Sequence, residues 1–177
     1  MLGRNGYGWG RGLHGDGPPP GAEGPLKVEG VGKSPAGVFG IGTIYGYAAA
    51  RPEAQLPYEQ ASNALRCVDD PTSPHYNRIV SKEDTAIDWS SAEQMRRDDE
   101  LYILAIVLEH NTGPVEPGAG SCIFVHLWNG PDVGMSGCTA MAMSDLGELA
   151  DWLEPDAVLV ALPRREYDAL RSVWSLP

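Results

Sequence analysis

Apolar residues in this chain occur in short runs separated by turn-forming residues. The run Leu101–Leu108 is the most apolar of these and is expected at the centre of a sheet. Four more runs are bounded on at least one side by Gly, Pro, Asn or Asp, and they predict strands. They lie at 38–47, 64–68, 121–127 and 157–162.

Three segments favour short helices. Ser90 or Ser91 can cap a helix over 91–99, with Glu93 in its first turn. Ser144 can cap a second helix, whose apolar positions 146, 149, 150 and 153 have amphipathic spacing. A third covers 164–174. The pattern therefore predicts a mainly β fold, a curved, sandwich-like sheet with a few short flanking helices.

The chain is expected to form one domain. Residues 1–24 are rich in Gly and Pro and predict an edge strand or an extended arm. Residues 25–177 contain all the other predicted elements, with no internal repeat and no linker between them. A single domain of this length can bury a sizeable core.

Charge excludes one class of partner. The formal net charge is −11, from 24 acidic and 13 basic residues. Nucleic-acid binding needs clustered Lys and Arg, so a nucleic-acid partner is not expected.

No apolar run approaches the roughly 18 residues of a spanning helix, so no membrane span is expected either. The first residues, Met1–Gly6, lack the apolar core of a signal peptide.

The stretch from Ser121 to Met141 contains the candidate chemistry. A predicted buried strand ends near His126, the turn-forming cluster Asn129–Asp132 can reverse the chain, and Cys138 follows Gly137. A loop of this size can bring His126 beside Cys138, where an imidazolium would lower the thiol pKa from about 8.5. The amides of Gly137 and Cys138 could then bind the oxyanion of an acyl-transfer intermediate. The alternative is a histidine and a small buried cysteine with purely structural roles.

The three cysteines leave two further arrangements open. Cys67 and Cys122 can pair in an oxidising compartment while Cys138 stays free. Alternatively, Cys122 and His126 share a strand face and could bind a metal together with Cys138. That site lacks a fourth ligand with plausible spacing, and no Cys-x-x-Cys is present, so no metal and no cofactor are expected.

Other polar residues lie at the ends of predicted elements. Tyr76 and Asn77 are candidates for the wall of a substrate groove, and local loop hydrogen bonding is the alternative. His110 and Asn111 follow the central strand and could line the same cleft. His110 is also the main rival to His126 as the base. Thr139, directly after the cysteine, completes the candidate substrate-binding set.

Two segments resemble the L,D-transpeptidase (YkuD-type) catalytic domain. His126–Met141 is similar to the family's active-site motif, a histidine, a loop, and a Ser/Thr-x-Gly-Cys-like turn followed by an apolar residue. Glu29–Phe39 resembles the family's Gly-x-Gly-Lys-Thr-Pro-x-Gly-x-Phe element. With the elements around them they cover about 26–162. The resemblance implies a catalytic site at Cys138, His126, Gly137 and Ser136.

The chain departs from that motif at two positions. The commoner motif has a histidine where this chain has Ser136, and an arginine where it has Ala140. The loop between His126 and Cys138 is also shorter than usual. The chain is therefore expected to belong to a divergent subgroup whose substrate details differ.

The resemblance implies acyl transfer on peptidoglycan stem peptides and a location in the periplasm or cell wall. His126 would act as the base and Cys138 would carry a thioester. One alternative is an L,D-carboxypeptidase or amidase that uses water as the acceptor. A second is a cell-wall-binding protein without catalytic activity. Oligomeric state, the donor and acceptor peptides, and the group that orients His126 stay open at this point.

Overall fold

The long strand β4 (Ser34–Gly46) organises a mainly β fold. The computed structural model describes residues 1–177 and contains twelve strands and two short helices. Five strands follow one another in the main sheet, in the order β1-β4-β9-β10-β11, and β5 and β12 also pair with β4. The bounds of the other six are β1 (Tyr7–Trp9), β5 (Tyr58–Gln60), β9 (Leu104–Leu108), β10 (Phe124–Leu127), β11 (Thr139–Met141) and β12 (Val158–Ala161).

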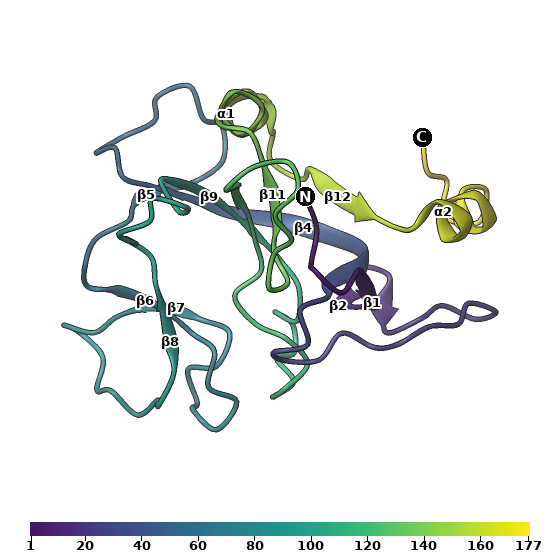
Figure 1. Cartoon of the computed structure of the whole chain (residues 1–177), viewed down its shortest axis with the longest axis horizontal. Coiled ribbons are helices and arrows are strands. Elements are labelled where there is room, and N and C mark those ends of the chain that lie inside the picture. The colour runs from purple at the N-terminus through teal and green to yellow at the C-terminus, as the bar shows by residue number, and fades with distance from the viewer.

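The main sheet is curved because β4 pairs with different neighbours along its length. Its first part pairs with β1 and β12, and its second part with β9 and β5. The register against β9 shifts between Ile41 and Ile44, and such an irregularity bends a strand. Figure 1 shows β4 crossing the molecule, with β12 beside it. The predicted curved, mainly β architecture with few helices is confirmed.

A second, smaller sheet packs against one part of the main sheet. It has the order β7-β6-β8 and lies at the lower left of Figure 1. The disulfide between Cys67 in β6 and Cys122, just before β10, joins the two sheets. A separate two-stranded hairpin, formed by β2 and β3, follows β1. The bounds are β2 (Arg11–Gly12), β3 (Gly15–Asp16), β6 (Leu65–Val68), β7 (Ile79–Ser81) and β8 (Ala92–Gln94).

Two hydrophobic clusters cover the two faces of the main sheet. On one face, α1 (Met143–Trp152) buries Leu146 and Ala150 against Ile106 and Val125. On the other face, the core contains both cysteines of the disulfide, the free cysteine and residues of the small sheet; its buried members are Tyr45, Ala61, Cys67, Met95, Tyr102, Ala105, Cys122, Phe124, Met135, Cys138 and Ala140. The candidate nucleophile therefore lies in the layer between the two sheets.

One helix prediction and one capping prediction were wrong. The segment predicted as a helix over 91–99 contains β8, which pairs antiparallel with β6. Pairing with β6 and burial of Met95 outweighed the capping signal of the serines. Ser144 does not cap α1, because the N-cap is Ala142 and no side chain bonds there. The C-terminal helix α2 (Arg164–Leu170) was predicted, although it ends four residues early.

The N-terminal residues pack onto the main sheet and onto the turn before Cys138. β1 pairs parallel with β4, and Gly3 forms a bridge with Met135. The Arg4 backbone N–H donates to the Met135 carbonyl at 2.7 Å. Residues within the predicted arm thus support the turn that presents the cysteine. None of the helices is long and apolar enough to cross a membrane.

Candidate functional site

The register of β10 and β11 places His126 and Cys138 on one face of the main sheet. The two strands run parallel, with His126 opposite Ala140 and Val125 opposite Thr139. Side chains alternate between faces, so Cys138 shares the face of His126 and lies diagonal to it. Phe124 and Cys138 belong to the core on this face, whereas Val125 belongs to the opposite core. The sequence had suggested a simple chain reversal, and the parallel pairing is a correction to it.

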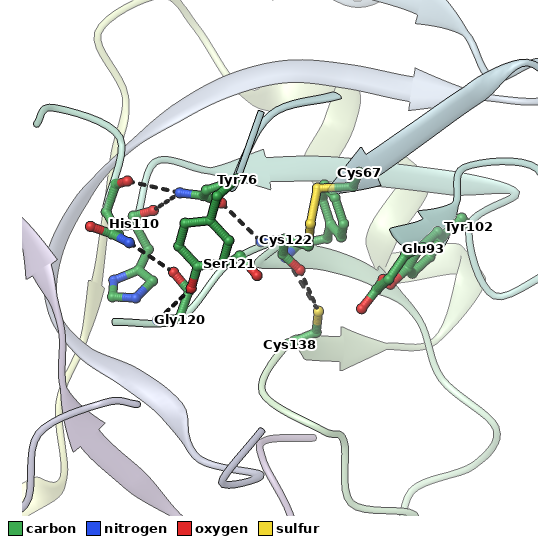
Figure 2. The surroundings of a disulfide bond; sticks show 12 residues. Cys67, Tyr76, Glu93, Tyr102, His110, Gly120, Ser121, Cys122 and Cys138 are labelled. Atoms are coloured by element: carbon green, nitrogen blue, oxygen red, sulfur yellow. Dashed lines mark hydrogen bonds between the residues drawn. A yellow bond between two sulfur atoms is a disulfide. The ribbon is translucent and has the colours of Figure 1, made fainter. Parts of the chain in front are cut away.

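The Cys138 thiol is free but buried. The residue is 8% exposed, and its sulfur contacts backbone groups on either side of β10's start. The Phe124 N–H donates to Sγ at 3.4 Å, and the S–H donates to the Cys122 carbonyl at 3.5 Å. Figure 2 shows this sulfur directed at the disulfide-bonded Cys122. Burial, reinforced by the Glu93 carboxylate, raises the pKa of Cys138 to about 12.

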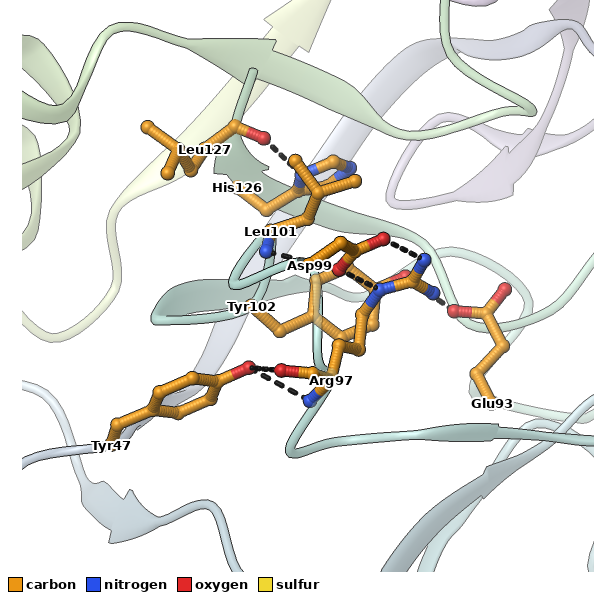
Figure 3. Close-up of polar contacts among 8 residues, drawn as sticks. All are labelled: Tyr47, Glu93, Arg97, Asp99, Leu101, Tyr102, His126 and Leu127. Atoms are coloured by element: carbon orange, nitrogen blue, oxygen red, sulfur yellow. Dashed lines mark hydrogen bonds and ion pairs between the residues drawn. The ribbon is translucent and has the colours of Figure 1, made fainter. Parts of the chain in front are cut away.

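Burial favours the neutral form of His126, and its own strand fixes the tautomer. Its Nδ1 lies 2.7 Å from the Leu127 carbonyl oxygen, which only accepts hydrogen bonds (Figure 3). Nδ1 must therefore carry the proton, and Nε2 of the neutral ring is left with its lone pair. The residue is 4% exposed, and burial lowers the pKa of His126 below its usual value of 6.5. The group that orients the histidine is thus a backbone carbonyl.

The ion pair expected between the two residues is absent from the resting site. No hydrogen bond joins His126 to Cys138, since Sγ bonds to backbone groups and Nδ1 bonds to Leu127. Burial favours the uncharged form of both groups. The geometry therefore supports a neutral base that takes the thiol proton as the sulfur attacks, instead of a preformed thiolate–imidazolium pair.

Two adjacent backbone N–H groups at the nucleophile have no partner. Neither the Gly137 nor the Cys138 N–H donates a hydrogen bond within the chain, although both residues are buried. Most buried backbone N–H groups in proteins are paired, so two in succession are unusual. They are the two donors that the sequence predicts for an oxyanion. An oxygen anion bound here would satisfy both.

The turn before Cys138 is fixed by the N-terminal residues and by β4. Ser34 Oγ accepts from the Gly3 N–H at 2.8 Å and donates to the Cys138 carbonyl at 3.0 Å. Ser136 is exposed, and its Oγ accepts from Arg4 Nη1 at 3.1 Å. Ser136 therefore points away from the core that contains the thiol, and its contact is with the supporting segment.

Sequence reasoning missed Glu93 and Tyr102, which lie beside the thiol. The Tyr102 hydroxyl donates to Glu93 Oε2, and the tyrosine ring packs on His126 with ring centroids 5.1 Å apart (Figure 3). Burial is the largest cause of the raised pKa of Glu93. The segment holding Glu93 was expected to be a surface helix, so no sequence signal placed this carboxyl in the site.

Sequence reasoning also missed Lys27, which lies near Gly137, and Glu29. Lys27 is buried, and Glu29 Oε2 accepts from the hydroxyls of Tyr76 at 2.5 Å and Ser121 at 2.6 Å. The segment 27–29 is thereby tied to the loop that leads into β10. The signal available in the sequence was a lysine between Leu26 and Val28, followed by a glutamate, directly before the predicted glycine-rich turn.

Four of the predicted substrate-binding residues hold loops together. Asn77 Nδ2 donates to the carbonyls of His110 and Asn111, and its Oδ1 accepts from the Cys122 N–H at 2.9 Å. Tyr76 also accepts from the Gly120 N–H at 3.1 Å. Asn111 bonds to the backbone of Glu116 and Gly120. These contacts fit the alternative of local loop hydrogen bonding.

His110 is a structural residue in this geometry. It is 1% exposed, its Nδ1 accepts from the Arg11 N–H at 3.2 Å, and its Nε2 lies 3.1 Å from the Ala119 carbonyl. Both ring nitrogens are thus used by the backbone, and burial lowers the pKa of His110 to about 4. Thr139 lies opposite Val125 and so faces away from the thiol. Neither residue lies next to Cys138.

The disulfide settles which cysteine is available. Cys67 and Cys122 are bonded, so Cys138 is the single free thiol. Cys122 is therefore not available as a metal ligand, and no cluster of three or more His, Cys, Asp or Glu could hold a metal ion.

The chain was compared with known proteins by sequence and by structure. It matches no protein-family model, no curated protein and no solved structure.

Proposed function

We propose that this chain is a cysteine-dependent acyltransferase of the L,D-transpeptidase type, acting on peptidoglycan stem peptides. The observation that carries the proposal is the set of groups around Cys138. A free thiol and a neutral histidine lie diagonal to each other on one sheet face, and the backbone N–H groups of Gly137 and Cys138 have no partner in the chain. Nucleophile, base and oxyanion donors are the three parts that acyl transfer requires.

In the first half of the reaction, Cys138 Sγ attacks an amide carbonyl of the donor peptide. His126 Nε2 takes the thiol proton, the S–C bond forms, and the N–H groups of Gly137 and Cys138 bind the carbonyl oxygen as it becomes an anion. The C–N bond then breaks, and His126 returns the proton to the departing amine. A thioester on Cys138 and a free terminal D-amino acid result.

In the second half, an amine of a second stem peptide attacks the thioester. The new C–N bond forms as the S–C bond breaks, and the amine's proton returns to the sulfur by way of His126. Water in place of the amine would give the carboxypeptidase or amidase reaction. No metal or organic cofactor takes part in either half.

The substrate class rests on the resemblance of the segments around Glu29–Phe39 and His126–Met141 to L,D-transpeptidase motifs. The Cys67–Cys122 disulfide supports the corresponding location in the periplasm or cell wall, because disulfides persist in oxidising compartments. The burial of Cys138 favours the second candidate, a wall-binding protein in which the thiol has only a packing role.

Acylation of the intact protein separates these functions. The protein, kept free of reductant, is incubated with a carbapenem or with purified muropeptides, and its mass is measured. Acyltransfer predicts one covalent adduct on Cys138 and none on Cys138→Ala. Product analysis with and without an acceptor amine distinguishes transpeptidation from hydrolysis. Binding to peptidoglycan without any adduct or product would overturn the proposal in favour of the wall-binding function.

A further inference from the structure

Lys27 is a buried cation without a carboxylate partner. The residue is 4% exposed, and lysine is almost never buried to this degree unless its charge is paired. No carboxylate oxygen lies within 4.0 Å of its Nζ. The ammonium donates one hydrogen bond, to the Val28 carbonyl at 2.9 Å. Since an ammonium has three donors, two have no acceptor in the chain.

The Lys27 side chain lies against two glycines that border the candidate site. A Cβ placed on Gly120 would lie 3.0 Å from Lys27 Nζ, and one placed on Gly137 would lie 3.6 Å from Lys27 Cε. Gly137 directly precedes the nucleophile, and Gly120 lies two residues before Cys122, whose carbonyl contacts the thiol. The missing side chains at both glycines thus leave room for the ammonium beside Cys138.

We propose that Lys27 is the counter-charge of Cys138, stabilising the anion that forms when the sulfur loses its proton and attacks. The inference rests on the proposed acyl transfer and adds a positioning residue to it. The proton of Lys27 stays on its nitrogen, and His126 remains the base. A buried charge is costly unless an opposite charge is supplied, and the anion that forms on the sulfur during attack supplies it.

Several other groups act on the same pair. Glu93 faces the sulfur from β8 and opposes its ionisation, whereas the Tyr102 hydroxyl and the Phe124 N–H favour it. Glu29 faces the ammonium from the same segment, and His110 lies near it from the loop after β9. His126 shares the sheet face with Cys138. Burial lowers the pKa of Lys27, while Glu29 and Cys138 raise it.

Alkylation of Cys138 by iodoacetamide tests the proposal without any substrate. Rates are measured from pH 6.5 to 11, without reductant, for wild type, Lys27→Met, Lys27→Arg and the control Lys33→Met. Lys33 follows Lys27 by six positions, and its Nζ donates to the Asn5 carbonyl at the surface. Lys27→Met should be about tenfold slower near neutral pH, equivalent to about one pKa unit at the thiol. Lys27→Arg should stay within about threefold of wild type, since the charge is kept.

The pH dependence distinguishes a charge from a packing role. The ratio of wild-type to Lys27→Met rates should shrink at high pH, as Lys27 loses its proton and its charge. A ratio near one, or one that does not change with pH, would overturn the proposal. If Lys27→Met does not fold by circular dichroism, Lys27→Gln replaces it. The same slowing near neutral pH is expected of Lys27→Gln, and a rate equal to that of wild type would overturn the proposal.

The two proposals fail in different ways. Normal alkylation with the expected Lys27 dependence, but no acylation by carbapenem or muropeptide, would overturn the acyltransferase function alone. Acylation of Cys138 with no effect of Lys27 on alkylation would overturn the role of Lys27 alone.

Discussion

His126 and Cys138 lie diagonal to each other on adjacent parallel strands, and no hydrogen bond joins them. The histidine is fixed by the Leu127 carbonyl and the thiol by the Cys122 carbonyl and the Phe124 N–H, so each is positioned independently of the other. Ala140, where the commoner family motif has an arginine, lies directly opposite His126. In the proposed reaction, proton transfer between them would therefore accompany attack on the substrate.

Replacing His126 should abolish most acyl transfer without disturbing the fold. His126→Gln removes the base and should lower the rate of carbapenem acylation by about 10²- to 10⁴-fold, the usual contribution of a general base. Because the pKa of His126 lies below 6.5, the wild-type rate should fall only below that pH. Stopped-flow or mass-spectrometric acylation rates give the measurement. The control is His75→Gln, on the small-sheet side near Asp88, and an equal loss there would show a general defect.

Removing the charge of Glu93 should have the opposite effect from removing that of Lys27. Glu93→Gln keeps the side-chain size but removes the carboxylate that raises the pKa of Cys138. Alkylation at pH 8 should become about three- to tenfold faster, because the pKa of the Cys138 thiol should fall by up to about one unit. The gain should fade at low pH, where Glu93 is itself protonated. Glu83→Gln, an exposed position, is the control, and equal rates for Glu93→Gln and wild type would contradict the prediction.

Opening the disulfide should destabilise the whole protein. Cys67 and Cys122 are separated by 55 positions, and a loop of that length corresponds to about 4 kcal/mol of unfolding free energy in the chain-entropy description. Urea unfolding of Cys138→Ala with and without reductant measures the difference without complication from the free thiol. Coincident unfolding curves would show that the link between the two sheets contributes little.

Stability should fall as the pH drops from about 6.5 to about 4. His110 is neutral when folded, because its pKa is lowered to about 4, whereas in the unfolded chain it takes up a proton near 6.5. The unfolded state therefore binds more protons in this window, and stability is complete above it and lost towards its lower end. His110 should therefore lower the free energy of unfolding by about 3 kcal/mol across this window, from about 1.4 kcal/mol per pKa unit.

The variant His110→Gln should flatten that part of the profile. Its unfolding free energy, measured by urea denaturation at several pH values, should change less between pH 6.5 and 4 than that of wild type. His126 and His14, whose pKa values are also lowered by burial, should contribute to the slope that remains. An unchanged slope in His110→Gln would contradict the assignment.

Much of the sheet could be predicted from local pattern. The apolar runs became β4, β6, β9, β10 and β12, and the most apolar of them, β9, lies between β4 and β10. The 91–99 segment could not be predicted, because its serines and Glu93 match a helix start while its pairing partner β6 is distant in sequence. Long-range pairing outweighed local propensity there.

The candidate site was predictable only where residues are close in sequence. His126, Gly137 and Cys138 share one stretch, so spacing and motif could place them together. Lys27 and Glu93 approach the thiol from segments far from it in sequence, and neither belongs to a recognisable catalytic pattern. The parallel pairing of β10 and β11 was hidden as well, because the Asn129–Asp132 cluster suggests a hairpin.

Because β10 and β11 pair in parallel, the length of the loop that connects them does not set the positions of His126 and Cys138. His126 and Cys138 are fixed by strand register and by contacts with Gly3, Ser34 and Arg4, whereas residues 131–134 between them are exposed. The entropic cost of lengthening such a loop grows only slowly, by about 0.6 kcal/mol for each doubling. Related sequences could therefore gain or lose residues in this loop over evolution while the positions of His126 and Cys138 are retained.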